Sequence, residues 1–284
     1  MSKERIRWKA MKNIKLNNGI EIPQLGLGVF QTPKGEDTVN AVKWALEAGY
    51  RHIDTAKVYG NEADVGQAIL ESKVPREEIF LTTKLWNDDI RAERTKEAFE
   101  ESLKALKTDY VDVFLLHRPS PLMQADEIAE AVEKLKGEGK IIDFGLSNFT
   151  SSQTELIRQK TEVSYNQVQF SATHYEPMLD GSLDYMQTNE IRPLSWNPLG
   201  TVFREDTKQT RRLKKLFSTL LEKYHLGADT LLLAWILKHP AKVIPIAGTV
   251  NIARIQALSK AVELEMDTED WFAIWTESMG DDVP

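Results

Sequence analysis

Four ionisable side chains stand at or just after short apolar segments of this sequence: Asp54, Tyr59, Lys84 and His117. A free phenol has a pKa of about 10 and is a poor acid near neutrality. A neighbouring cation stabilises phenolate and lowers that pKa, so Lys84 close to Tyr59 would make a tuned proton donor. Asp54 would hold Lys84, and His117 would donate a hydrogen bond to a substrate carbonyl oxygen. The set predicts an acid that protonates an alkoxide while hydride arrives at carbon.

Each of these residues also has a simpler interpretation. Asp54 and Lys84 on their own fit a buried ion pair between strands, and without the others we would favour that reading. Asn61 fits the N-cap of a following helix. His117, at the end of an apolar segment, fits a buried histidine with satisfied hydrogen bonds. The combination on consecutive strands favours the chemical interpretation.

The elements that would position these residues alternate between apolar strands and amphipathic helices. Asn18-Gly19 indicates a hairpin over 14–22. Strands are predicted near 24–29, 51–55, 80–85, 111–117, 141–146, 163–169, 192–196 and 243–247. Helices are predicted at 36–48, 62–72, 91–106, 125–138, 151–159, 179–189, 211–224 and 252–263, with extra helices at 228–238 and 268–276.

This alternation predicts an α/β fold, a (β/α)8 TIM barrel with an N-terminal β-hairpin, in a single domain over residues 1–284. A doubly wound open sheet is the alternative, because short apolar segments do not reveal whether a sheet closes. In a barrel the carboxyl ends of all strands share one face. That face would bring the four ionisable residues together.

Composition excludes several classes of function. The 284 residues carry a net charge of -7, which argues against nucleic-acid or anionic-membrane partners. The sequence has no cysteine, so disulfides, thiolate catalysis and cysteine-based zinc sites are excluded. Its five histidines lack metal-binding spacing, so no metal site is expected. No apolar segment has the length of a signal peptide or membrane span, which predicts a soluble cytoplasmic protein.

Three further signals are weaker when taken alone. Gly26-Leu27-Gly28 follows a predicted strand, but Gln31 occupies the third glycine's place of a dinucleotide fingerprint, so we interpret these glycines as close-approach positions. Ser147 and Asn148 end another strand, where an N-cap by Asn148 or Thr150 is the simpler reading. Trp86 and Trp196 end strands where an aromatic face could stack on a flat ligand.

The segments Gly49–Ala56, Tyr59–Glu62, Thr83–Trp86 and Leu115–His117 together resemble the aldo-keto reductase family. The resemblance spans almost the whole chain. It implies a barrel that reduces aldehydes or ketones with a nicotinamide cofactor held without a Rossmann fold. It also implies that Tyr59 is the general acid, tuned by Lys84 and Asp54, and that His117 orients the carbonyl.

The resemblance also implies a cofactor and a substrate pocket. Ser147 and Asn148 would hold the nicotinamide carboxamide with Gln167 beside them, and Trp196 would stack on the ring. The other implied cofactor contacts are Gly28, Asp54, Asn197, Leu199, Gly200, Gly248, Thr249, Asn251 and Arg254. Phe30, Trp86 and Arg118 would line the substrate pocket.

Two departures from the family pattern affect these expectations. Ile244-Pro245-Ile246-Ala247 stands where many relatives have Ile-Pro-Lys-Ser, so a phosphate-binding lysine is missing, and Ala257-Leu258 replaces a Glu-Asn pair. Arg254 can still meet a 2′-phosphate bidentately, so NADPH is the expected cofactor and NADH the alternative. Arg118 replaces a tryptophan common after the histidine; it would favour carboxylate- or hydroxyl-bearing substrates, or is a surface arginine.

The resemblance is not uniform along the chain. Residues 12–110 are similar to bacterial diketogluconate reductases, whereas the part from Leu115 onward is similar to another bacterial oxidoreductase branch. We therefore predict a recombined or engineered chimera with a join near 108–117. The leading functional hypothesis is a monomeric NADPH-dependent reductase of small-molecule carbonyl compounds. The alternative is a cofactor-binding barrel with little or no turnover, such as a regulatory subunit or an engineered scaffold.

Overall fold

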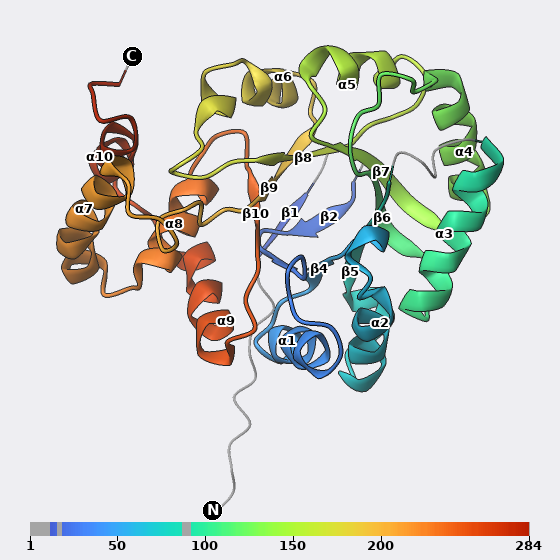
Figure 1. Ribbon diagram of the computed structural model, residues 1–284, viewed down its shortest axis with the longest axis horizontal. Coiled ribbons are helices and arrows are strands. Elements are labelled where there is room, and N and C mark those ends of the chain that lie inside the picture. Colours follow the sequence, from blue (N-terminus) through green and yellow to red (C-terminus); the bar gives the residue numbers. More distant parts are fainter. Residues whose placement is uncertain (1–11, 16–18, 87–91, 284) are drawn as a thin grey trace, which may run out of the picture.

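The computed structural model describes residues 12–15, 19–86 and 92–283, and its central feature is a closed barrel. Eight parallel strands follow the order β10-β3-β4-β5-β6-β7-β8-β9, with helices arranged around them (Figure 1). The predicted α/β barrel is confirmed. The open-sheet alternative is wrong, because β10 pairs with β3 on one side and with β9 on the other.

The strands of the barrel are short and lie within or close to their predicted ranges. They are β3 (Gly26–Gly28), β4 (His52–Asp54), β5 (Phe80–Leu85), β6 (Val111–Leu116), β7 (Ile141–Ser147), β8 (Tyr165–Gln169), β9 (Arg192–Trp196) and β10 (Ile244–Ala247).

The helices cover the outer face of the barrel. They are α1 (Glu36–Glu47), α2 (Glu62–Glu71), α3 (Ala92–Leu106), α4 (Ala125–Gly137), α5 (Ser151–Arg158), α6 (Ser182–Thr188), α7 (Lys208–Tyr224), α8 (Ala228–Leu237), α9 (Ile252–Leu258) and α10 (Thr268–Met279). Among the described residues, none of these helices combines the length and apolarity needed to cross a membrane.

Several helix boundaries differ from prediction. Helix α9 ends at Leu258, where a 3-10 helix over Ser259–Glu263 follows, and α10 extends to Met279. Helix α7 begins earlier than predicted, because Thr207 and Thr210 form a capping box at its start. Helix α6 is shorter than the predicted 179–189, because Gly181 adopts a left-handed φ of 81° directly before it. A 3-10 turn at Glu176–Met178 precedes that glycine.

The N-terminal hairpin closes one end of the barrel. Strands β1 (Asn13–Lys15) and β2 (Glu21–Pro23) pair antiparallel, which confirms the predicted hairpin. Residues 16–18, which include part of the predicted turn, lie outside the described residues. Ile14 and Ile22 pack into an apolar cluster inside the barrel with Phe80, Val113, Leu115, Tyr165, Leu194, Ile244 and Ile246. This apolar plug leaves the opposite end, at the carboxyl ends of the strands, for polar residues.

Strand alternation places polar side chains in two layers of the interior. Successive side chains of a strand point to opposite faces, so residues two apart share a face. His52 Nε2 lies 3.0 Å from Thr82 Oγ1, and two residues further along the same strands Asp54 contacts Lys84. Both layers are buried. The strands therefore carry Asp54 and Lys84 to the carboxyl end of the barrel as a pair.

The predicted join near 108–117 overlaps an uninterrupted part of the barrel. Strands β5 and β6 pair over four consecutive positions, from Thr82 opposite Val113 to Leu85 opposite Leu116. The backbone amide of His117 continues this pairing by donating to Leu85 O at 3.0 Å. Tertiary contacts thus connect the two sides of the predicted join, and a recombined origin stays a prediction.

Candidate functional site

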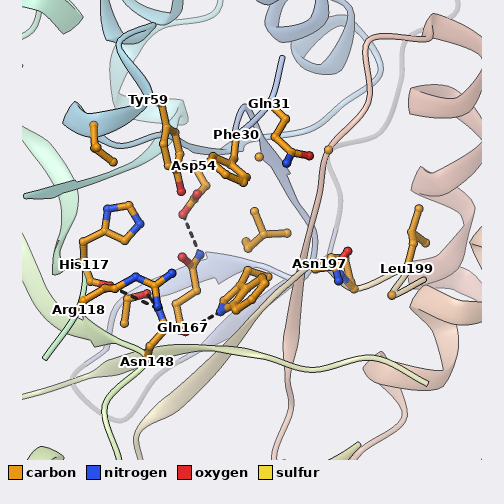
Figure 2. A pocket seen from close by; sticks show the side chains of 18 of the residues that line it. Phe30, Gln31, Asp54, Tyr59, His117, Arg118, Asn148, Gln167, Asn197 and Leu199 are labelled. Atoms are coloured by element: carbon orange, nitrogen blue, oxygen red, sulfur yellow. Dashed lines mark hydrogen bonds between the residues drawn. The ribbon is translucent and has the colours of Figure 1, made fainter. Parts of the chain in front are cut away.

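A cavity of about 650 Å³ opens at the carboxyl ends of the barrel strands (Figure 2). Most of the residues singled out from the sequence line it. These are Gly28, Phe30, Asp54, Tyr59, Trp86, His117, Arg118, Ser147, Asn148, Gln167, Trp196, Asn197, Leu199, Gly200, Gly248 and Arg254. Lys84 lies buried beneath this lining, whereas Thr249 and Asn251 do not line the cavity.

One side of the cavity, which we call the tyrosine end, consists of Asp54, Tyr59, Lys84 and His117. Lys84 Nζ donates to Asp54 Oδ1 at 2.5 Å and to the Thr55 carbonyl at 2.8 Å. The same ammonium lies 3.4 Å from the hydroxyl of Tyr59. The simple reading of Asp54 and Lys84 as a buried ion pair is therefore correct, but the pair also reaches the phenol.

The turn that carries Tyr59 is held against the barrel by polar contacts. Tyr59 ends a 3-10 turn and is followed by Gly60 in a left-handed conformation, with φ of 67°. Asn61 Nδ2 donates to the Val29 carbonyl at 2.9 Å, and Asn61 Oδ1 accepts from Thr55 Oγ1 at 3.2 Å. The expectation that Asn61 caps helix α2 is wrong, because its side chain is used in these contacts and makes no capping bond.

Burial, more than the nearby cation, sets the protonation of Tyr59. Loss of solvent raises the pKa of its phenol above the ordinary value, and the charge of Lys84 opposes that rise without reversing it. Lys84 thus lowers the pKa of Tyr59 as expected, but burial outweighs it, and the expected net lowering below the ordinary value is wrong. The raised pKa keeps Tyr59 protonated at neutral pH, so the group remains a proton donor.

The two other titratable partners have opposite charge states. Burial opposes the charge of Lys84, but Asp54 and Tyr59 together outweigh this effect and raise the pKa of Lys84, which stays an ammonium. Burial, with smaller contributions from Lys84 and Arg118, lowers the pKa of His117 to about 3. His117 is therefore a neutral imidazole, which can donate a single hydrogen bond without carrying charge.

His117 is not the fully satisfied buried histidine of the simpler reading. Its Nδ1 atom is buried and has no hydrogen-bond partner among the described residues. The ring packs edge-on against Tyr59 and Trp86, with centroid distances of 5.6 and 5.2 Å. Aromatic contacts therefore orient the imidazole beside the phenol, as Figure 2 shows for His117 and Tyr59.

Next to the tyrosine end lies a cluster of amide and hydroxyl groups. Gln167 Nε2 donates to Asp54 Oδ2 at 2.9 Å, and Asn148 Oδ1 accepts from the Trp196 indole at 2.8 Å. Asn148 Nδ2 lies 2.9 Å from Ser147 Oγ. The polar groups of three predicted cofactor residues, Ser147, Asn148 and Gln167, are thus gathered near the carboxyl ends of β7 and β8, with the Trp196 indole bound to Asn148.

Backbone geometry supports this cluster. Asn148 has a positive φ of 63°, a conformation in which asparagine is enriched. It does not cap helix α5; Thr150 does, in a capping box with Gln153. Gly28 is needed for close approach of a strand, because a Cβ there would lie 2.9 Å from Ile246 Cγ2. The interpretation of Gly28 as a close-approach position is confirmed.

The other side of the cavity, which we call the arginine end, consists of Phe203, Arg204 and Arg254. Arg254 Nε lies 3.1 Å from Asp229 Oδ2, and its guanidinium lies 5.9 Å from the centroid of Phe203. Arg204 Nη2 donates to Asn197 Oδ1 and to the Gly200 carbonyl, both at 2.7 Å. In Figure 2 Asn197 lies across the cavity from Tyr59 and His117.

Several lining residues were not among the predicted site residues: Gln31, Val58, Pro198, Phe203, Arg204 and Ile246. Most of them lie within a few residues of a predicted site residue, and this proximity in the sequence could have identified them. Arg204 is the important omission, because it adds a second cation at the arginine end. Asn251, predicted as a cofactor contact, instead caps helix α9 by accepting from the Arg254 backbone amide at 3.1 Å.

Comparison with known proteins connects this site to one family. The model of the Aldo/keto reductase family matches residues 24–276. The chain is 37% identical over 262 residues to methylglyoxal reductase DkgA of Escherichia coli (strain K12), covering 90% of both chains. It is 36% identical over 260 residues to glyoxal reductase of Bacillus subtilis (strain 168), covering 90% of this chain and 89% of that one. Both alignments are long enough to cross the predicted join.

A solved structure shares the fold over most of its length. The crystal structure of an aldo-keto reductase of Bombyx mori in complex with NADP has a TM-score of 0.83 and 31% sequence identity, over 95% of this chain and 93% of that one.

Proposed function

Because the chain belongs to the Aldo/keto reductase family and is an oxidoreductase, we propose that it reduces aldehydes or ketones to alcohols with NADPH and with Tyr59 as the proton donor. The observation that carries this proposal is the arrangement of the tyrosine end. A protonated phenol faces the cavity, a buried ammonium stands 3.4 Å behind its hydroxyl, and a neutral imidazole lies beside it.

Each residue of the tyrosine end has its own role in the proposed carbonyl reduction. The substrate oxygen gains negative charge as hydride adds to carbon, and the Tyr59 hydroxyl supplies the proton that neutralises it. The charge of Lys84 then stabilises the phenolate that remains. Asp54 holds Lys84 in place, and His117 donates a hydrogen bond that orients the carbonyl oxygen.

The cavity fits a nicotinamide cofactor by the chemistry of its lining. Ser147, Asn148 and Gln167 offer hydroxyl and amide groups suited to a carboxamide, and Trp196 offers an aromatic face. When bound, the reduced cofactor supplies hydride from C4 of its nicotinamide. Asn197, Leu199 and Gly200 would hold the pyrophosphate, with Gly28 and Gly248 at the strand ends. We propose no role for Thr249 or Asn251 beyond the turn that presents Arg254.

The preference for NADPH rests on the arginine end. Arg254 can bind a 2′-phosphate through its guanidinium, although Asp229 already accepts from its Nε atom. Ile246 lines the cavity at the place of the lysine that many relatives carry, so this position contributes no charge. Arg204 adds a cation nearby. These features support a preference for NADPH, with NADH as a weaker alternative.

The substitution Tyr59→Phe tests the proposal directly. Turnover of a generic aldehyde should fall by about 10²- to 10⁴-fold, the usual range for loss of a general acid, while the Kd for NADPH changes little. Tyr175→Phe is the matched control, because it removes the same hydroxyl from a residue that does not line the cavity. Unchanged turnover in Tyr59→Phe would contradict the assignment.

The same measurements separate the reductase from the alternative. NADPH quenching of tryptophan fluorescence reports binding, and loss of NADPH absorbance in the presence of aldehyde reports turnover. Binding without consumption by the unaltered protein would support a cofactor-binding barrel with little or no turnover.

A further inference from the structure

The cavity is cationic although the protein is acidic. The whole chain carries a net charge of -7, yet the charged residues lining the cavity are Arg118, Arg204, Arg254 and Asp54. Asp54 is already paired with Lys84 at 2.5 Å. Arg254 is paired with Asp229, so Arg118 and Arg204 leave the cavity with positive charge, which attracts anionic ligands.

These arginines lie at two separate places. Arg204 and Arg254 belong to the arginine end, where phosphate groups are the anions to be bound. Arg118 follows His117 directly in the chain and lies beside it in Figure 2, next to the tyrosine end. A cofactor held as proposed places its phosphates at the arginine end. Arg118 is thus left for an anionic group on the other reactant.

Among the described residues, the guanidinium of Arg118 contacts an aromatic ring and no carboxylate. Its Cζ atom lies 6.0 Å from the centroid of Trp86, whose ring in turn packs on His117. A guanidinium over an aromatic face keeps its in-plane N–H groups free for a bidentate partner. Across the parts of the chain that the structure describes, Arg118 forms no ion pair or hydrogen bond.

The charge of Arg118 also reaches the groups that would handle the carbonyl. It helps to lower the pKa of His117 and opposes the rise in the pKa of the Tyr59 phenol. This effect agrees with the geometry, in which Arg118 lines the same cavity as Tyr59 and His117.

We propose that the preferred substrates are aldehydes or ketones that also carry a carboxylate, which Arg118 binds while the carbonyl oxygen meets Tyr59 and His117. This inference rests on the reductase function proposed above and specifies its substrate class. The aromatic side chains at the mouth, Phe30 and Trp86, suit a flat or short hydrocarbon between the two polar groups. Phe30 is 61% exposed, so such a substrate would cover it.

A matched pair of substrates tests the inference. 4-Carboxybenzaldehyde and its methyl ester have similar size but differ in charge, and the ester has the more electrophilic aldehyde, so a preference for the acid does not come from intrinsic reactivity. With the unaltered protein and saturating NADPH, kcat/KM should favour the acid by about tenfold, as expected for one charge-assisted pair near solvent. Arg118→Gln should lower the acid-to-ester ratio of kcat/KM to one or below, and Arg118→Lys should retain part of the preference.

Salt and a control substitution sharpen the test. Raising ionic strength should reduce kcat/KM for the acid more than for the ester, because it screens the exposed pair. Arg94→Gln, which removes an exposed cation of α3 away from the cavity, should leave the ratio unchanged.

The outcomes separate this inference from the function on which it depends. Reduction of both aldehydes with no preference for the acid, or a preference that Arg118→Gln leaves intact, would overturn the substrate class alone. Reduction of neither aldehyde would overturn the reductase proposal and this inference with it.

Discussion

The two ends of the cavity contrast in how their charges are held. At the tyrosine end Lys84 is fully buried and Asp54 is 3% exposed, and the pair is joined by a short contact. At the arginine end the side chain of Arg254 is 43% exposed and is held by one carboxylate, Asp229. Charges buried in this way act strongly on their neighbours, whereas exposed ones are screened by water and salt.

This difference in burial suits the tyrosine end to the chemical step and the arginine end to the recognition of charged ligands. A buried charge pair can stabilise a phenolate with little reorganisation, which suits a chemical step that must be the same for every substrate. Exposed arginines contribute modest, salt-dependent binding that a ligand's phosphate or carboxylate can use. Substitutions at the two ends of the cavity and in the layer beneath it test this difference.

The largest effect is expected at Lys84. Lys84→Met should lower the free energy of unfolding by about 3–5 kcal/mol, because it leaves Asp54 buried and uncompensated. Turnover should also fall by at least about 10²-fold, since the phenolate of Tyr59 loses its cation. Chemical denaturation and an aldehyde assay measure the two effects.

A double variant separates stability from chemistry at this position. Adding Asp54→Asn to Lys84→Met removes both charges and should recover part of the lost stability, but not the turnover. Lys96→Met, at an exposed lysine of α3, is the control and should change neither by much. Full stability in the single variant would mean that the pair is not as desolvated as the structure indicates.

The layer beneath the tyrosine end should make the protein sensitive to acid. Burial, reinforced by the charge of Lys84, lowers the pKa of His52 from 6.5 to about 3. The unfolded chain therefore binds a proton between these values that the folded protein does not. The contribution is fully present above pH 6.5 and is lost as the pH falls; by pH 4.5 the loss is about 3 kcal/mol.

His52→Gln isolates this contribution, because glutamine does not titrate. The free energy of unfolding should fall less steeply between pH 7 and pH 4.5 in the variant than in the unaltered protein. The difference in slope is the readout, so a constant loss of stability from the altered packing does not affect it. Parallel pH profiles would show that His52 has the same pKa in the folded protein as in the unfolded chain.

The smallest effect is expected at the arginine end. Arg254→Gln should raise the Kd for NADPH by about fivefold to tenfold, or about 1–1.4 kcal/mol, and leave the Kd for NADH nearly unchanged. Arg211→Gln, at an exposed arginine of α7 paired with Asp206, is the matched control. Equal losses for both cofactors would mean that Arg254 does not bind the 2′-phosphate.

Local sequence patterns predicted most of the fold and the residues of the cavity. Short apolar segments that alternate with amphipathic ones predicted every strand of the barrel, because a barrel strand is buried on both faces and a covering helix on one. The predicted roles were wrong for side chains that can form hydrogen bonds with more than one partner. Asn61 binds Val29 and Thr55 rather than capping α2, and Asn251 caps α9 rather than lining the cavity. A single-domain, monomeric, cytoplasmic chain stays a prediction.

The sequence by itself determined which chemical groups are present and which strands carry them, including Tyr59, Lys84 and the unusual Arg118. Only the tertiary structure decided their states. It buried Tyr59 enough to raise its pKa despite Lys84, and it joined Gln167 to Asp54 across the barrel. Protonation depends on solvent exclusion and on neighbours distant in sequence, and both exist only once the barrel has closed.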